Sequence, residues 1–216
     1  MTFLKNRPQG KKMGIIILAA LIIISLAEII FRVVAIGKAV GNTTNFGEDV
    51  ATIVLAATIL ILTAKGKDRA CYICYGAFAG YFILDQLFEL PGMVGTLMSN
   101  ISNPVATFSI VIRILTMVCI IAIGVLLVEY MNDGTICNRA FNTISLITIL
   151  LLAVTILTSA TGLIFAPSDG AEIILLKKQN VLIIFNNMYR IAMVVLFTFF
   201  AYDSAKAQLK KTNLTK

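Results

Sequence analysis

Three carboxylates and three guanidinium groups lie inside stretches of the chain that are otherwise apolar: Glu28, Asp85, Glu89, Arg32, Arg113 and Arg190. One such charge at the centre of a membrane-spanning helix costs roughly 2.5–3.5 kcal/mol, so charges there pair with one another or serve a ligand. Guanidinium groups bind anionic groups, and carboxylates bind cationic ones. The six charges therefore predict a polar site inside a membrane protein.

The spacing of these side chains favours a shared inner face. Glu28 lies four residues before Arg32, which places both on one side of a helix. The same spacing joins Asp85 to Glu89 and Asn186 to Arg190. Polar faces turn inward in a membrane because lipid offers them no hydrogen bonds. The candidate ligand-binding residues are Glu28, Arg32, Asp85, Glu89, Arg113, Asn186, Asn187 and Arg190.

The elements that position these side chains are predicted to be membrane-spanning helices. The 216 residues are 59% hydrophobic, with a mean hydropathy of +0.93. A span needs about 20 mostly apolar residues, and six stretches qualify: approximately 14–36, 48–64, 71–90, 105–128, 140–165 and 181–202. The sequence therefore predicts an all-α integral membrane protein, with six transmembrane helices in one bundle and a single polytopic membrane domain over residues 1–216.

The basic residues predict the orientation of this bundle. Twelve of the 18 lysines and arginines lie in the two tails and in the connections expected on the same side. The opposite connections hold only Lys38, Lys177 and Lys178, accompanied by acids such as Glu48 and Asp49. The positive-inside rule then places both termini in the cytoplasm of a multi-pass cell-membrane protein. The net charge of +7 is explained by topology and by contact with membrane lipid, and no nucleic-acid partner is expected.

The rise of about 1.5 Å per residue places the charges at similar depths. Glu28 and Asp85 fall roughly 21 Å above the cytoplasmic face, and Arg113 about 18 Å above it. Arg190 is expected about one turn lower, while Arg32 and Glu89 are expected about one turn higher. The depths predict one charged layer in the outer half of the bundle.

One break in the third span is predicted from its backbone chemistry. Pro91 cannot extend the hydrogen-bond ladder, and Gly92 accepts unusual dihedral angles, so the helix is expected to end there. The short apolar segment 93–98 is then expected to form an interfacial turn or a partial helix across the outer mouth.

The chain offers little for catalysis. It contains no histidine, the commonest general base near neutral pH. No serine or cysteine has a neighbouring base, and no glycine-rich phosphate loop occurs. The single pair Asp85 and Glu89 does not supply the several carboxylates that hold Mg²⁺ in membrane enzymes. We therefore expect no enzymatic activity, no catalytic residue, no metal site and no cofactor.

Two functions are the main alternatives, and a third, an ion or proton pathway that depends on Asp85 and Glu28, also remains open. In the first, the layer lines an outward-facing pocket that binds a small polar or charged solute, and the protein is a transporter or the substrate-binding subunit of an importer with a motor partner. In the second, the charges are structural ion pairs, for example Asp85 with Arg113 and Glu28 with Arg190. The protein is then a non-catalytic membrane partner, such as an assembly, immunity or sensor subunit.

The size, six spans and outer polar pocket resemble the substrate-capture subunits of energy-coupling-factor vitamin importers. That resemblance implies a partner membrane motor, which docks on small residues spaced four apart in the first helix. Ala19, Ala20, Ser25 and Ala27 do not reproduce that pattern cleanly. The resemblance is one of architecture and carries no functional residue to this chain.

Overall fold

A computed structural model describes residues 8–36, 43–65, 68–102, 104–133, 138–165 and 171–214. The described chain is helical apart from short turns. Its elements are α1 (Pro8–Phe31), the π-helical turn η1 (Arg32–Ile36), α2 (Thr43–Ala64), α3 (Asp68–Ser99), α4 (Pro104–Asp133), α5 (Asn138–Phe165) and α6 (Ala171–Leu214). The predicted all-helical class is confirmed.

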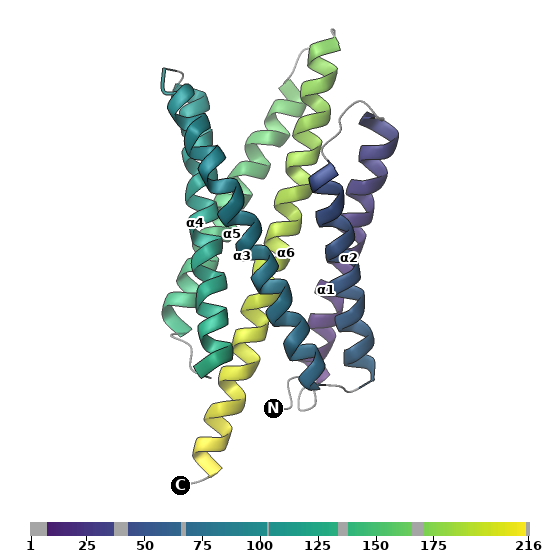
Figure 1. Ribbon diagram of the computed structural model, residues 1–216, viewed down its shortest axis with the longest axis vertical. Helices are drawn as coiled ribbons and strands as arrows, with labels where there is room; N and C mark the ends of the chain where they lie inside the picture. The colour runs from purple at the N-terminus through teal and green to yellow at the C-terminus, as the bar shows by residue number, and fades with distance from the viewer. Residues whose placement is uncertain are drawn as a thin grey trace.

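The helices run alternately up and down, so that α1 begins and α6 ends at the same end of the molecule (Figure 1). We call this the terminal end. Each helix packs against its neighbour in the chain, and α1 also packs against α6, which closes the bundle into a ring. Both α3 and α6 cross the bundle at a slant (Figure 1). A site inside the ring can therefore draw side chains from helices that are distant in sequence.

Four helices are long and apolar enough to cross a membrane. Their apolar stretches are Gly14–Val34 in α1, Thr107–Leu127 in α4, Ala140–Phe165 in α5 and Leu176–Thr198 in α6. The apolar stretch of α2, Asp49–Ala64, is shorter, and Asp85 and Glu89 lower the mean hydropathy of α3. Length and composition thus indicate a membrane protein in which four of the described helices are able to span the membrane, and the count of six spans stays a prediction from the sequence.

The predicted end of the third helix at Pro91 is wrong. Pro91 lies inside α3, which continues to Ser99. An interior proline removes one backbone hydrogen bond and crowds the preceding turn, but membrane helices tolerate prolines where neighbouring groups satisfy the freed backbone atoms. The Asn100 side chain then donates a hydrogen bond to the Thr96 carbonyl at 2.9 Å, which satisfies one of the last carbonyls of the helix. The segment 93–98 is therefore the last part of α3 and not a separate turn.

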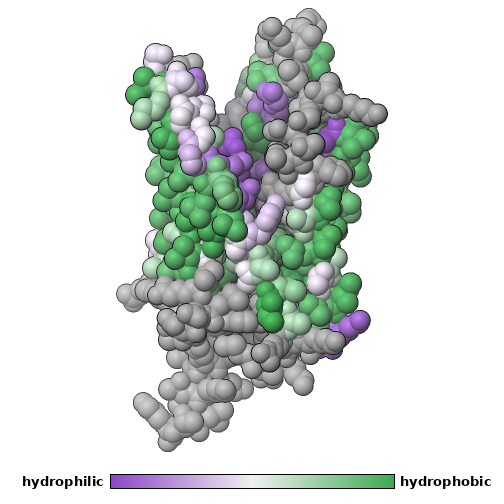
Figure 2. All heavy atoms as spheres, in the orientation of Figure 1, coloured by the Kyte–Doolittle hydropathy of each residue, from purple (hydrophilic) through white to green (hydrophobic). Residues whose placement is uncertain are grey.

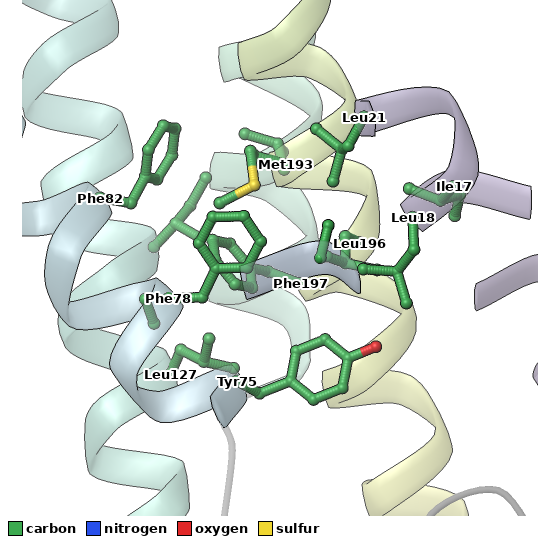
Figure 3. Packing of buried hydrophobic residues seen from close by; sticks show 14 of the residues in the cluster. Ile17, Leu18, Leu21, Tyr75, Phe78, Phe82, Leu127, Met193, Leu196 and Phe197 are labelled. Carbon is green, nitrogen blue, oxygen red and sulfur yellow. The ribbon is translucent and has the colours of Figure 1, made fainter. Parts of the chain in front are cut away.

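The helices meet at an apolar core in the half of the bundle near the terminal end (Figure 3). Phe78 and Phe82 project from one face of α3, and Met193 and Phe197 project from one face of α6, at the four-residue spacing of helical neighbours. The rings of Phe82 and Phe197 lie 6.0 Å apart. These side chains are at most 2% exposed, so the core excludes water. We call this group the aromatic core.

A glycine sets the close approach of α3 to α4. A Cβ atom added at Gly124 of α4 would overlap the Ile83 Cγ1 atom of α3. Small residues at helix contacts of this kind are typical of membrane bundles, where close packing stabilises association.

Candidate ligand-binding site

The surface is hollowed at the end opposite the terminal end, and hydrophilic atoms gather in the hollow (Figure 2). We call this hollow the notch. It lies between the arm formed by α3 and α4 and the remaining helices (Figures 1 and 2). Apolar side chains cover the outer surface of the same arm (Figure 2). A polar hollow between apolar helix faces is the kind of place where a membrane protein binds a charged ligand.

Glu89 of α3 lies between two arginines from different helices. Its Oε2 atom is 3.7 Å from an Arg113 guanidinium nitrogen of α4 and 3.4 Å from an Arg190 guanidinium nitrogen of α6. The Glu89 side chain is 38% exposed and that of Arg113 is 47% exposed. Glu89 lies in the last third of α3 and Arg113 in the first third of α4, so their exposed ion pair lies toward the end of the bundle that carries the notch. Neither distance is that of a short, bidentate pair.

The Arg190 side chain is buried more deeply than those of Glu89 and Arg113. It is only 5% exposed, and its Nε atom makes no hydrogen bond within the described residues. A buried donor without an acceptor is costly, about 1–3 kcal/mol. Arg190 therefore has unused binding capacity beside the exposed Glu89.

Asp85 completes the group on α3, one turn before Glu89. Gln86 donates a hydrogen bond from its Nε2 atom to the Asp85 Oδ2 atom at 2.6 Å. Asp85 also interacts electrostatically with Glu89, Arg190 and Arg113. We call Asp85, Glu89, Arg113 and Arg190 the notch cluster. It contains two carboxylates and two guanidinium groups, so its charges balance.

A second group of charges joins α1 to α2. Arg32 forms an ion pair with Glu28, one turn earlier in α1. The Nε atom of Arg32 also lies 3.9 Å from the Asp49 Oδ2 atom of α2. All three side chains are largely buried. We call Glu28, Arg32 and Asp49 the α1–α2 cluster.

Two aromatic side chains, Tyr189 and Phe82, pack between the notch cluster and the terminal end of the bundle. Tyr189 precedes Arg190 in α6, and its ring packs edge-on against Phe82 of α3, with centroids 6.2 Å apart. The Thr52 hydroxyl of α2 donates a hydrogen bond to the Tyr189 hydroxyl oxygen at 3.1 Å. The notch cluster is therefore accessible from the notch and separated from the terminal end by the aromatic core.

The structure gathers six of the eight candidate residues into the two clusters, and the ion pairs within them differ from those expected. Arg113 pairs with Glu89 and not with Asp85, and Glu28 pairs with Arg32 and not with Arg190. Glu89 and Arg190, expected at different depths, are in contact. The depth estimate assumed upright helices, whereas α3 and α6 are slanted (Figure 1).

The two asparagines of α6 do not join an ion pair. The Asn187 side chain donates a hydrogen bond to the Ile183 carbonyl of its own helix at 2.7 Å. Asn186 is half-buried one turn before Arg190. Asn187 is therefore occupied by its own helix, and Asn186 stays a predicted ligand-binding residue.

Sequence reasoning missed one member of these clusters, Asp49, and one residue that bonds to a member, Gln86. Asp49 was counted with the charges of an outer connection, yet it lies in α2 and is only 7% exposed. Gln86 is fully buried beside Asp85 and was not considered. A signal existed for Asp49, because Asp49, Thr52 and Ala56 repeat at helical spacing along one buried face of α2.

Fold and site together define a class: an all-helical protein with four helices able to span a membrane and a charged cluster open at one end. The chain matches no protein-family model, no curated protein and no solved structure. The resemblance to vitamin-importer subunits therefore stays a prediction from architecture.

Proposed function

We propose that the protein is a small-solute membrane transporter, or the substrate-binding membrane subunit of an importer, and that the notch cluster binds the solute. The observation that carries the proposal is Glu89, a part-exposed carboxylate held loosely between Arg113 and Arg190. An exposed ion pair contributes only about 0–1 kcal/mol to stability, and a buried one repays its desolvation only when its geometry is close. These pairs are long and open to the notch, which favours a site that exchanges partners.

The chemistry of the notch cluster favours a solute with both an anionic and a cationic group. The anionic group takes the place of Glu89 at Arg113 and Arg190, where guanidinium groups suit a carboxylate or phosphate. The cationic group is held by Asp85. Two charges of each sign make the site neutral, so a solute without net charge can enter at a low electrostatic cost.

The proposal includes six spans, with α2 and α3 held in the membrane by the four more apolar helices. It also places both termini in the cytoplasm, on the basis of the twelve basic residues at that side. The notch then opens outward, and the aromatic core lies on the cytoplasmic side. A pocket open to one side and closed to the other is what solute capture requires.

The test is ligand binding by the purified full-length protein in lipid nanodiscs. Zwitterionic solutes, monocarboxylates, phosphates and neutral analogues are screened by the rise in melting temperature that each produces. For a solute that stabilises the protein, Arg113→Gln is expected to weaken binding about tenfold or more, because one charge-assisted hydrogen bond is lost. Lys65→Gln removes the same charge at an exposed position of the terminal end and leaves binding unchanged.

Glu89→Gln separates the proposal from the structural alternative. If Glu89 occupies the arginines until a solute displaces it, this variant binds the anionic group more tightly. If the ion pairs are structural, Glu89→Gln and Arg113→Gln each lower the melting temperature, the double variant recovers part of the loss, and no solute stabilises the wild type. That second outcome supports a non-transporting membrane partner and contradicts the transport proposal.

A further inference from the structure

The α1–α2 cluster contains more negative than positive charge. Glu28 and Asp49 both pair with the single guanidinium of Arg32. The side chains are 4%, 9% and 16% exposed respectively, so water screens their charges poorly. Two ionised carboxylates and one guanidinium leave one negative charge in excess. An uncompensated charge is expensive at such a buried position.

Charges on the neighbouring helices do not remove this excess. Arg190 of α6 interacts electrostatically with Glu28, but its guanidinium already pairs with Glu89. The notch cluster balances its own two carboxylates with its own two arginines. Across both clusters, four carboxylates face three guanidinium groups among the described side chains. The excess of one negative charge therefore stays with Glu28 and Asp49.

Two buried side-chain oxygen atoms of α1 and α2 have no hydrogen-bond partner among the residues that the structure describes. They are the Oδ2 atom of Asp49 and the hydroxyl oxygen of Ser25. The 3.9 Å between the Asp49 oxygen and the Arg32 Nε atom is too long for a hydrogen bond. Ser25 is fully buried and lies three residues before Glu28, on the same face of α1. Both oxygen atoms are thus available to a ligand.

Carboxylate and hydroxyl oxygen atoms are the ligands that hard cations prefer. We propose that Glu28, Asp49 and Ser25 form a binding site for one monovalent cation, a sodium ion or a proton, between α1 and α2. One such cation balances the excess negative charge of the α1–α2 cluster. The site is separate from the proposed solute site and does not depend on it.

The test measures the melting temperature of the full-length protein in nanodiscs without any solute. Sodium chloride replaces choline chloride at constant ionic strength, and the series is repeated between about pH 5 and pH 8. If sodium binds, the melting temperature rises by about 5 °C when sodium exceeds its dissociation constant about a hundredfold. If a proton binds, the folded state holds more protons than the unfolded state, so stability increases as the pH falls.

Three variants locate the effect. Asp49→Asn removes the excess charge with little change in shape. It is expected to abolish the dependence of the melting temperature on sodium and on pH. Asp85→Asn removes an equal charge from the notch cluster, and its melting temperature is expected to depend on sodium and on pH as in the wild type. Ser25→Ala removes one oxygen ligand without changing the charge, so it weakens the sodium response and leaves a proton response intact.

Two results overturn the cation site. One is a wild-type melting temperature that is independent of both sodium and pH. The other is an Asp49→Asn variant that keeps the wild-type dependence. Because the measurement contains no solute, either result leaves the proposed function of the notch cluster standing, and failed solute binding leaves the cation site standing.

Discussion

The notch cluster and the aromatic core lie next to each other on α3 and α6, and they are built in opposite ways. In the aromatic core, Phe78, Phe197 and Met193 are completely buried and pack directly. In the notch cluster, Glu89 and Arg113 are part-exposed and lie 3.7 Å apart. Close packing fixes one arrangement of side chains, whereas loose ion pairs can exchange partners. The difference assigns a stabilising role to the aromatic core and supports the proposal that the notch cluster binds a ligand.

The largest expected effect is that of Phe78→Ala in the aromatic core. Removing a fully buried ring leaves a cavity, and the free energy of unfolding is expected to fall by about 4 kcal/mol. Thermal or chemical unfolding in detergent measures the loss. Phe88→Ala is the matched control, since Phe88 lies on the same helix and is 82% exposed. Equal losses for both variants would contradict the division into a stabilising core and an exposed surface.

Gly124→Ala tests how closely the α3–α4 arm is packed. The new methyl group overlaps the Ile83 side chain, so the free energy of unfolding is expected to fall by about 2 kcal/mol. Gly80→Ala is the control, because a Cβ atom there meets nothing within 4 Å. It should be neutral or slightly stabilising. If Gly124→Ala has no effect, the two helices are not in close contact.

Thr52→Val tests the hydrogen bond between Thr52 and Tyr189, which lies between the notch cluster and the aromatic core. It removes the hydrogen bond to Tyr189 that joins α2 to α6, and the free energy of unfolding is expected to fall by about 1 kcal/mol. Thr58→Val is the same change on the same helix, but the Thr58 hydroxyl bonds to the Val54 carbonyl of its own helix. The free energy of unfolding is expected to fall less for Thr58→Val than for Thr52→Val. The reverse order would show that the hydrogen bond between Thr52 and Tyr189 contributes nothing to stability.

Arg113→Gln is expected to have the smallest effect on stability. A pair as exposed as Arg113 and Glu89 contributes about 0–1 kcal/mol to the free energy of unfolding, and salt screens it. Unfolding of the wild type and the variant at low and high salt measures this contribution. A loss as large as that of Phe78→Ala would show that the notch cluster is a structural element like the aromatic core.

Part of the site could be predicted from the sequence because it depends on one helix at a time. The four-residue spacing of Glu28 and Arg32 predicted that both lie on one side of a helix, and the two side chains form an ion pair there. The partners of Glu89 could not be predicted, because spacing along one helix says nothing about which other helices pack against it. Asp49 was missed for a related reason. Near the start of an apolar stretch, a carboxylate looks like part of a connection until the neighbouring helix is known to bury it.

The sequence by itself determined that this protein is helical and has apolar stretches fit for a membrane, because hydropathy and helical periodicity are local properties of the chain. It also determined that charges lie within those stretches. Only the tertiary structure decided how the charges group. The slant of α3 and α6 brings Glu89 to Arg113 and Arg190, and the packing of α1 on α2 buries Asp49 beside Arg32. Electrostatic interactions act across space, so their partners are fixed by packing and not by order along the chain.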